Sequence, residues 1–438
     1  MQLVAMGAQD VYLTGNPQIT FFKVVYRRHT NFSKECIAQT FSGSIPETGT
    51  GSVTCTLARN GDLVQEIYLK ATLNASNDTN EQTVTLLSST NVFTVSSTAS
   101  LPTGANVSFD IDISTTDDGV VIHKDRRYVV VNIDGTTFSL TDNGVAVIWT
   151  TGAAGFTTGA KVSVESVAID KDITDLIKTV EVEIGGQKID KHYSQWLDIY
   201  NELFETSHDY RNAMSLGTPG NNKTVYIPLR FWFNRNPGLA LPLIALQYHE
   251  VKVLMDLNVP ANSTMGDAKL LVNYLYLDTD ERRRFAQVSH EYLIEQVQHT
   301  GAESEATIDM NFNHPVKALF WTGGSWTNVK LQLNGHDRAA EQPHDYYHLV
   351  QPYESGLGHS GKQMNGTRGW ATVAAGGDVG MYSFCLKPAE HQPSGTCNFS
   401  RIDNARLNVG GTGVLHLFAM NYNVLRIMSG MGGLAYSN

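Results

Sequence analysis

Apolar and polar residues alternate with a period of two along most of the chain, in short runs that end at glycine, proline, asparagine or aspartate. One such run places Val180, Val182 and Ile184 before Gly185 and Gly186. This alternation is typical of β-strands that bury one face and end in tight turns. The clearest exception is 192–204, where the apolar residues repeat at helical spacing: Tyr193, Trp196, Leu197, Tyr200, Leu203 and Phe204. The pattern predicts an all-β chain with short helices.

The order of the predicted strands occurs twice along the chain. Residues 179–193 and 328–347 share one strand, turn and strand pattern. Further matches follow in the same order: 230–234 with 382–386, 250–257 with 403–409, and 272–278 with 416–422. Upstream, the best pairs are 21–30 with 291–300 and 63–73 with 316–324. Matches in order at nearly constant offset indicate two copies of one β domain, with roughly a hundred extra residues in the first.

About eight strands and one helix in each copy favour a β-sandwich of the jelly-roll type. The predicted fold is two tandem eight-stranded jelly rolls with short helices, plus a small β module inserted in the first. The predicted divisions are an N-terminal arm 1–17, a first jelly roll 18–280 with the module at about 77–167, a linker 281–290, and a second jelly roll 291–438. Arg282, Arg283 and Arg284 in that linker could bind phosphate, but a solvated or intersubunit linker fits the acidic chain better.

The insertion has its own alternating apolar residues between turn residues, so we expect a surface mini-domain at one end of the sandwich. Tyr128 and Trp149 could stack on sugars, as aromatic residues do in lectins. Both lie in alternating strand patterns that suit a small core instead.

The composition narrows the classes of partner. Apolar residues make up 42% of the chain and charged residues only 17%, with a formal net charge of -11. Binding to nucleic acid needs clustered lysine and arginine, so no direct nucleic-acid contact is expected. The N-terminus lacks a secretory pattern, and the longest apolar run, 238–246, is too short to span a bilayer. A cytosolic product is expected, with reduced, buried thiols at Cys36, Cys55, Cys385 and Cys397.

Residues 391–404 place His391, Cys397, Ser400 and Asp403 close together in sequence. Hydrolases assemble such groups from distant parts of the chain, and Ser400 lacks the flanking glycines of a nucleophile elbow. A turn followed by a strand from Cys397 to Ile402 fits better. No catalytic site is predicted.

His344 and His348 have the spacing that places two imidazoles on one helix face, beside Asp345. The motif lacks the glutamate that follows the first histidine in zinc hydrolases, and Tyr346 and Tyr347 suit a packed helix. We therefore expect neither a metal site nor a cofactor.

Eight N-x-S/T sequons occur in the chain, a number close to chance in so asparagine- and threonine-rich a sequence. Asn31 and Asn398 are expected in core strands. The glycosylation candidates lie in predicted loops: Asn74, Asn106, Asn262 and Asn365.

Several long segments closely resemble the major capsid proteins of large icosahedral DNA viruses of the type that infects algae. They include GAQDVYLTGNPQITFFK, EIGGQKIDKHY, NPGLALPLIALQYHEV, QPSGTCNFSRIDN and NYNVLRIMSGMGGLAY. The resemblance covers the chain apart from 77–167. It implies a double jelly-roll subunit in homotrimers of pseudo-hexagonal outline that tile an icosahedral shell, with the N-terminal arm inside and the opposite loops facing the host.

The resemblance also implies the partners and the place of assembly. Neighbouring capsomers, minor capsid and penton proteins, internal membrane-associated viral proteins and a host surface receptor are the expected partners. The protein would be made in the host cytoplasm and reside in the virion capsid. The alternative is a jelly-roll spike that binds carbohydrate or a receptor, since lectins use the same fold. An enzyme ranks third, because neither a phosphate-binding loop nor a paired-carboxylate motif appears.

Overall fold

The structure is a computed structural model. It describes residues 28–75, 176–204, 222–259, 263–357 and 379–436, and shorter pieces at 14, 16–18, 20–22, 24, 82–86, 92–96, 106–109, 113–114, 121–122, 128–142, 145–147 and 161–164. The predicted N-terminal arm, 1–17, lies almost wholly outside these residues. None of the helices in the described part is both long and apolar enough to cross a membrane.

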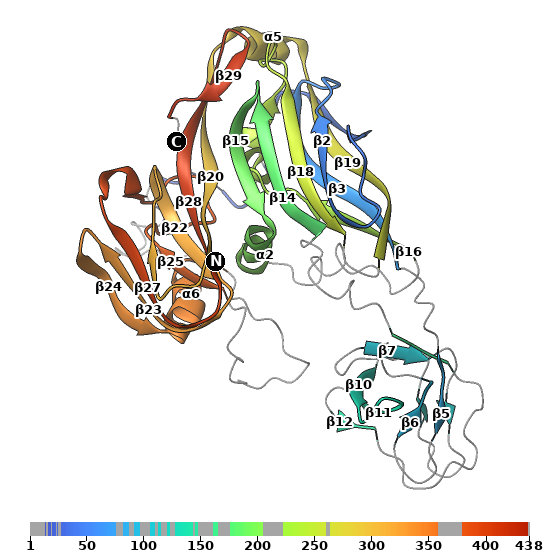
Figure 1. Ribbon diagram of the computed structural model, residues 1–438. Coiled ribbons are helices and arrows are strands. Elements are labelled where there is room, and N and C mark those ends of the chain that lie inside the picture. Colours follow the sequence, from blue (N-terminus) through green and yellow to red (C-terminus); the bar gives the residue numbers. More distant parts are fainter. Residues whose placement is uncertain are drawn as a thin grey trace, which may run out of the picture.

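The first sandwich has a five-stranded and a four-stranded sheet that face each other (Figure 1). One runs in the order β1 (Phe32–Gln39), β19 (Ser263–Leu277), β3 (Leu63–Ala75), β16 (Asn222–Pro228), and the short β17 (Leu241–Pro242) also pairs with β3. The other runs β15 (Gln187–Tyr193), β14 (Ile177–Ile184), β18 (Val251–Val259), β2 (Gly49–Thr56). Their inward side chains form the largest core of the chain. Strands that pair far apart in sequence in this way make a jelly roll.

The second sandwich repeats this topology. One sheet runs β20 (His290–Glu303), β28 (Leu415–Met428), β22 (Pro315–Thr322), β25 (Gly380–Ser383), extended by β26 (Cys397–Asn398) and β29 (Met431–Leu434). The other runs β24 (His336–Pro343), β23 (Ser325–Leu333), β27 (Ala405–Thr412), β21 (Thr307–Asp309). Apart from β29, each strand has a counterpart in the first sandwich in the same chain order. The predicted pair of tandem jelly rolls is confirmed.

The predicted matches 179–193 with 328–347, 63–73 with 316–324, 250–257 with 403–409 and 272–278 with 416–422 fall on equivalent strands. Two further matches were wrong in detail. The counterpart of β20 is β1, which starts after 21–30. Residues 230–234 contain a helical turn, α4 (Trp232–Arg235), because consecutive buried aromatic residues cannot alternate across a sheet.

The inserted segment forms a separate small β structure, drawn in teal at the lower right of Figure 1. Its strands are β4 (Gln82–Thr83), β5 (Thr85–Leu86), β6 (Phe93–Thr94), β7 (Asn106–Phe109), β8 (Ile113–Ser114), β9 (Val121–Ile122), β10 (Tyr128–Asn132), β11 (Thr137–Asp142), β12 (Val145–Ala146) and β13 (Lys161–Val164). Phe93, Phe109 and Phe138 pack in a core of its own. Tyr128 belongs to that core, as expected, and Trp149 lies outside the described residues. The predicted inserted β module is therefore present.

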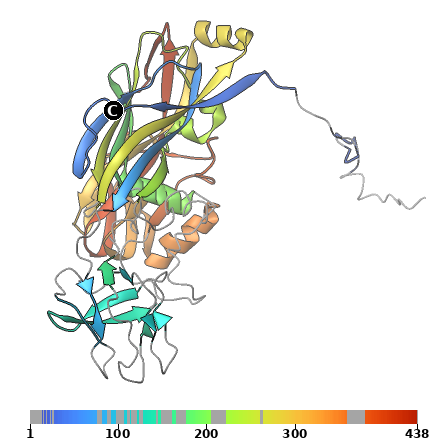
Figure 2. The same ribbon diagram turned by 90° about the vertical axis from the view of Figure 1, so that its right-hand side faces the viewer.

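Two helices mark the ends of the first roll. The predicted helix at 192–204 is α2 (Ser194–Leu203). The predicted linker overlaps α5 (Thr279–Gln287), at the end of the molecule opposite the inserted module (Figure 2). Asp278 caps α5 by accepting a hydrogen bond from the Thr279 amide, and Arg282 pairs with Asp62 at 3.0 Å. Shorter helical turns are η4 (Pro237–Leu239), η5 (Tyr346–Val350), α6 (Gln351–Glu354) and η6 (Phe399–Arg401).

Candidate functional site: the junction between the jelly rolls

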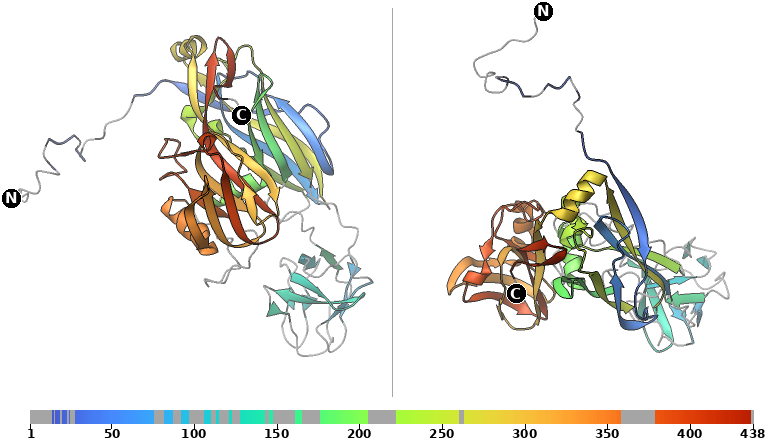
Figure 3. Two further views of the ribbon diagram at one scale, coloured as in Figure 1. Left: turned by 60° about the vertical axis from the view of Figure 1, so that its left-hand side comes forward. Right: turned by 90° about the horizontal axis from the view of Figure 1, so that it is seen from above.

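Helix α2 lies between the two jelly rolls and packs in two directions (Figure 3). Leu197 enters the core of the first roll. Trp196, Ile199 and Leu203 instead cover the outer face of the second roll, where they meet Ala318, Phe320, Phe418 and Met420. Trp196 and Phe320 make an edge-to-face contact with ring centroids 5.5 Å apart. The helix thus has two apolar faces, where the sequence predicted a single one, and it joins the rolls through apolar contacts.

A buried charge network fixes the same junction. Glu295 on β20 accepts from Arg235 of the first roll at 2.5 Å and from Lys317 on β22 at 2.6 Å. The Lys317 side chain is 1% exposed and also donates to the Glu390 carbonyl at 3.0 Å. Burial, followed by the nearby Glu295 charge, raises the pKa of Tyr422, whose ring lies 5.0 Å from the Lys317 ammonium. Charges this deep need such partners, because desolvation without them is costly.

A second polar contact links β15 to β20. Asp190 accepts from the Val297 amide at 3.0 Å and lies 2.9 Å from the imidazole of His192, which stacks on Phe231. The Gln296 amide donates to the Ile189 carbonyl. Asp190 and His192 are both buried. Because backbone and side chains of both rolls share these bonds, the relative orientation of the rolls is fixed by specific contacts.

Two histidines lie where α2 begins. His299 on β20 and His416 on β28 approach to 3.2 Å between Nε2 and Nδ1. His299 also stacks on Phe418 and contacts Tyr193. Burial and then the neighbouring His416 lower the pKa of His299 to about 4, and burial lowers the pKa of His416. Both rings are therefore neutral near pH 7.

The four residues of the 391–404 segment have separate structural roles. Ser400 accepts from the His314 amide at 2.8 Å, and the Asp403 amide donates to Asn334. Burial raises the pKa of the Cys397 thiol and lowers the pKa of His391. In the described part of the chain, no hydrogen bond joins any two of the four. The predicted strand was too long, because β26 ends at Asn398, whose side chain turns the backbone by accepting from the Ser400 amide.

The histidine pair His344 and His348 packs against the second roll. The ring of His344 lies 4.2 Å from that of Trp326, and His348 is hydrogen-bonded to the Val379 carbonyl at 3.0 Å. Over the residues that the structure describes, no three His, Cys, Asp or Glu side chains are grouped so as to hold a metal ion.

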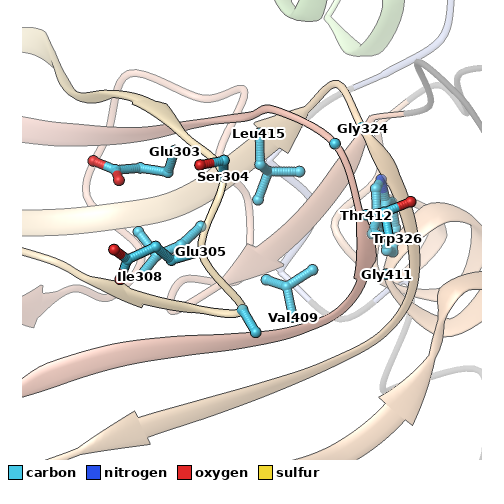
Figure 4. Close-up of a pocket in the computed structure, with 12 residues that line it drawn as sticks. Glu303, Ser304, Glu305, Ile308, Gly324, Trp326, Val409, Gly411, Thr412 and Leu415 are labelled. Atoms are coloured by element: carbon cyan, nitrogen blue, oxygen red, sulfur yellow. The ribbon is translucent and has the colours of Figure 1, made fainter.

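A small pocket lies at the end of the second roll away from α5 (Figure 4). Glu303 is the last residue of β20, Ser304 and Glu305 follow it, and Trp326 and Leu415 add apolar surface. Its lining residues include no imidazole, thiol or amine.

The sequons and cysteines are placed as follows. Asn74 is the second-last residue of β3 and pairs with Asn222, and Asn106 is the first residue of β7. Neither backbone therefore lies in a loop, as had been expected. Asn262 and Asn365 lie outside the described residues. Asn31 and Asn398 are exposed, where core positions were expected.

The sequence predicted four buried thiols. Cys55 and Cys385 are buried and Cys397 is half-buried, but Cys36, on the outer face of β1, is exposed.

The sequence did not predict the junction. Lys317 within the apolar run PVKALFW was the available signal, because a lysine in a buried strand needs a partner. That partner, Glu295, could not be identified from spacing alone.

Two tandem jelly rolls joined by a packed junction place the fold in the class of double jelly-roll viral capsid proteins. Comparison with known proteins identifies the family. Residues 20–120 and 150–278 match the family described as major capsid protein N-terminus, and 281–328 and 323–433 match large eukaryotic DNA virus major capsid protein. The chain belongs to the family of large eukaryotic DNA virus major capsid proteins and is a structural component of a virion capsid.

Individual relatives agree over the full length. The major capsid protein of Pyramimonas orientalis virus is 44% identical, over 100% of this chain and 99% of the relative. That of Paramecium bursaria Chlorella virus 1 is 36% identical over the same shares. The solved capsid structure of the latter virus is 31% identical with a TM-score of 0.64, covering 96% of this chain and 100% of that one. The Faustovirus major capsid protein, 12% identical with a TM-score of 0.62 over 97% and 94%, shares the fold.

Proposed function

We propose that three copies of this capsid protein form a homotrimer of pseudo-hexagonal outline, and that such trimers tile an icosahedral shell. The observation that carries the proposal is an asymmetry between the two rolls. The outer face of the second roll is covered by α2. In the part of the chain that the structure describes, no helix covers the equivalent face of the first roll, where Glu66 and Lys70 of β3 are half-buried and Tyr226 of β16 is exposed.

Among the described residues, the helical segment equivalent to α2, formed by η5 and α6, also has an exposed face. Leu197 and Tyr347 occupy matching places, since each follows a strand hairpin and enters the core of its own roll. Six residues later, Leu203 is 1% exposed against the second roll, and Tyr353 of α6 is 83% exposed. Val350 beside it is also exposed. The second roll therefore has an exposed helix face and the first roll an exposed sheet face. Within the chain, α2 and the outer sheet of the second roll are two such faces packed together.

Both faces would be buried if two copies repeated the contact that α2 makes with the second roll within one chain. The α6 face of one copy would pack on the β1-β19-β3-β16 face of the next, as α2 packs within the chain. Such a head-to-tail contact leads to a closed ring when the rotation closes. Three chains with two rolls each give a ring of six similar rolls.

The test is the mass in solution of the purified chain and of a double variant, Val350→Glu with Tyr353→Asp. We expect the unmodified protein at about three times 48.1 kDa, with interfaces well above roughly 2,000 Å². The double variant should run as a folded monomer. The control, Ile133→Asp on the exposed surface of the inserted module, should remain trimeric. A well-folded monomer of the unmodified chain at micromolar concentration would contradict the trimer, and a trimeric double variant would contradict the α6 contact.

Neighbouring trimers, minor capsid and penton proteins, internal membrane-associated viral proteins and a host receptor complete the proposed set of partners. Assembly in the host cytoplasm and a purely structural, non-enzymatic role belong to the same proposal. Glycosylation at Asn74, Asn106, Asn262 or Asn365 is a separate hypothesis, which intact mass of protein from virions would test.

A further inference from the structure

An exposed apolar surface lies at the α5 end of the molecule. We call it the tip patch and define it as Tyr248, Val288, Met428 and Met431, which are 76%, 53%, 48% and 52% exposed. The Tyr248 amide donates to the Gly430 carbonyl at 3.0 Å, in the turn that joins β28 to β29. Val288 directly follows α5, whose Phe285 stacks on His290, and His290 pairs with Ile427 beside Met428. Flexible methionines around an aromatic ring form a surface that adapts to another apolar group.

A second exposed apolar element lies before β1. Phe21, Phe22 and Val24 are 89%, 98% and 95% exposed, so two aromatic rings and a branched side chain are left uncovered by the residues that the structure describes. This arm segment enters the fold at Phe32, which pairs with Leu277, two residues before α5 begins. It therefore joins the molecule at the same end as the tip patch.

The arm segment is long enough to reach a tip patch. The length of α5, nine residues, separates the start of β1 from Val288 by about 14 Å. The chain between Phe22 and Phe32 spans up to roughly 30 Å when extended. In a single chain both surfaces are exposed, although the arm is long enough to reach its own patch, and a contact with another copy would bury both of them.

We propose that Phe21, Phe22 and Val24 of one copy dock on the tip patch of a neighbouring copy. The occupant is a segment of this chain, held by burial of its aromatic rings against Tyr248, Met428 and Met431. The inference rests on the proposed assembly of copies, and it concerns the end of the molecule away from the inserted module. Lys23, Arg27 and Arg28 accompany the rings and no acidic residue lies between 11 and 34, so an anionic lipid surface is the competing occupant.

Disulfide trapping between differently marked chains tests the docking. In a Cys36→Ser background, which removes the exposed native thiol, one chain carries Phe22→Cys and the other Met431→Cys. Mixed, assembled and oxidised, they should give a cross-linked dimer on a non-reducing gel. The matched control replaces Met431→Cys by Ile133→Cys on the inserted module and should give only background. A yield no higher than this control overturns the proposal.

A second measurement does not depend on the cysteines. Phe21→Ser with Phe22→Ser, and Met428→Ser with Met431→Ser, should impair particle formation equally, and combining all four should add nothing further, because both pairs remove one contact. Additive defects would overturn the proposal. The proposal would also be overturned if no cross-link formed and only the arm variant lost binding to phosphatidylserine vesicles, because the arm would then bind lipid. Mass in solution, measured on every variant, separates these failures from a failure of the trimer.

Discussion

Replacing Glu295 by glutamine should destabilise the protein far more than the same change on the protein surface. Glu295 holds two cations, Lys317 at 2.6 Å and Arg235 at 2.5 Å, and its side chain is 7% exposed. Arg235 keeps a bond to the Arg230 carbonyl, but Lys317 would remain buried without a carboxylate, with only neutral partners such as the Glu390 carbonyl and the Tyr422 ring. Removing one member of a buried ion pair costs about 3–5 kcal/mol, because a charge is left without compensation.

The assay is thermal unfolding followed by circular dichroism. At about 2 °C per kcal/mol for a protein of this size, Glu295→Gln should lower the Tm by about 6–10 °C. The control is Glu291→Gln on the same strand, where an equally short but exposed pair with Arg426 is worth at most about 1 kcal/mol. The double variant Glu295→Gln with Lys317→Met should recover much of the loss. Equal Tm shifts for Glu295→Gln and Glu291→Gln would refute the argument that burial makes this network matter.

Acid should weaken the junction. The folded pKa values of His299 and His416 lie below the usual value, so the unfolded chain binds more protons, and stability falls as the pH drops from about 6.5 towards 4. Unfolding midpoints should drop by the equivalent of about 1–2 kcal/mol after solvent screening, and less in His416→Gln. Replacing residues 77–167 by a short Gly and Ser linker should keep the trimer mass and remove antibody or receptor contacts on particles, since the module has a core of its own; misfolding of the deletion would contradict this. Deleting residues 2–15 should leave trimers intact and impair shell formation, and dissociated trimers would show that the arm belongs to the subunit core.

The strand pattern could be predicted because most strands bury one face. Val180, Val182 and Ile184 of β14 alternate with half-buried residues, and the repeat of this alternation in β23 revealed the second roll. The prediction failed where side chains are buried in several directions. Phe231, Trp232 and Phe233 are consecutive and all buried, and the chain there forms α4.

The junction was hidden for a different reason. Its bonds join residues far apart in sequence, such as Arg235 with Glu295, and period-two alternation carries no information about which charge meets which. The sequence pattern also could not separate the two apolar faces of α2, because a helix between two cores has apolar residues over most of its circumference.

The strands β1 and β20 occupy the same topological position in the two rolls but are covered to different extents. In β20, the consecutive residues Ile294, Glu295, Gln296 and Val297 are all buried, because the first roll covers the side that a single sandwich would leave to solvent. In β1, whose sequence is FSKECIAQ, nearly every side chain is exposed or half-exposed. A contact formed during folding can be dry and apolar, whereas one formed between finished subunits must keep each subunit soluble beforehand. The polar character of β1 is therefore what a surface needs if it is first exposed to water and only later covered by another copy.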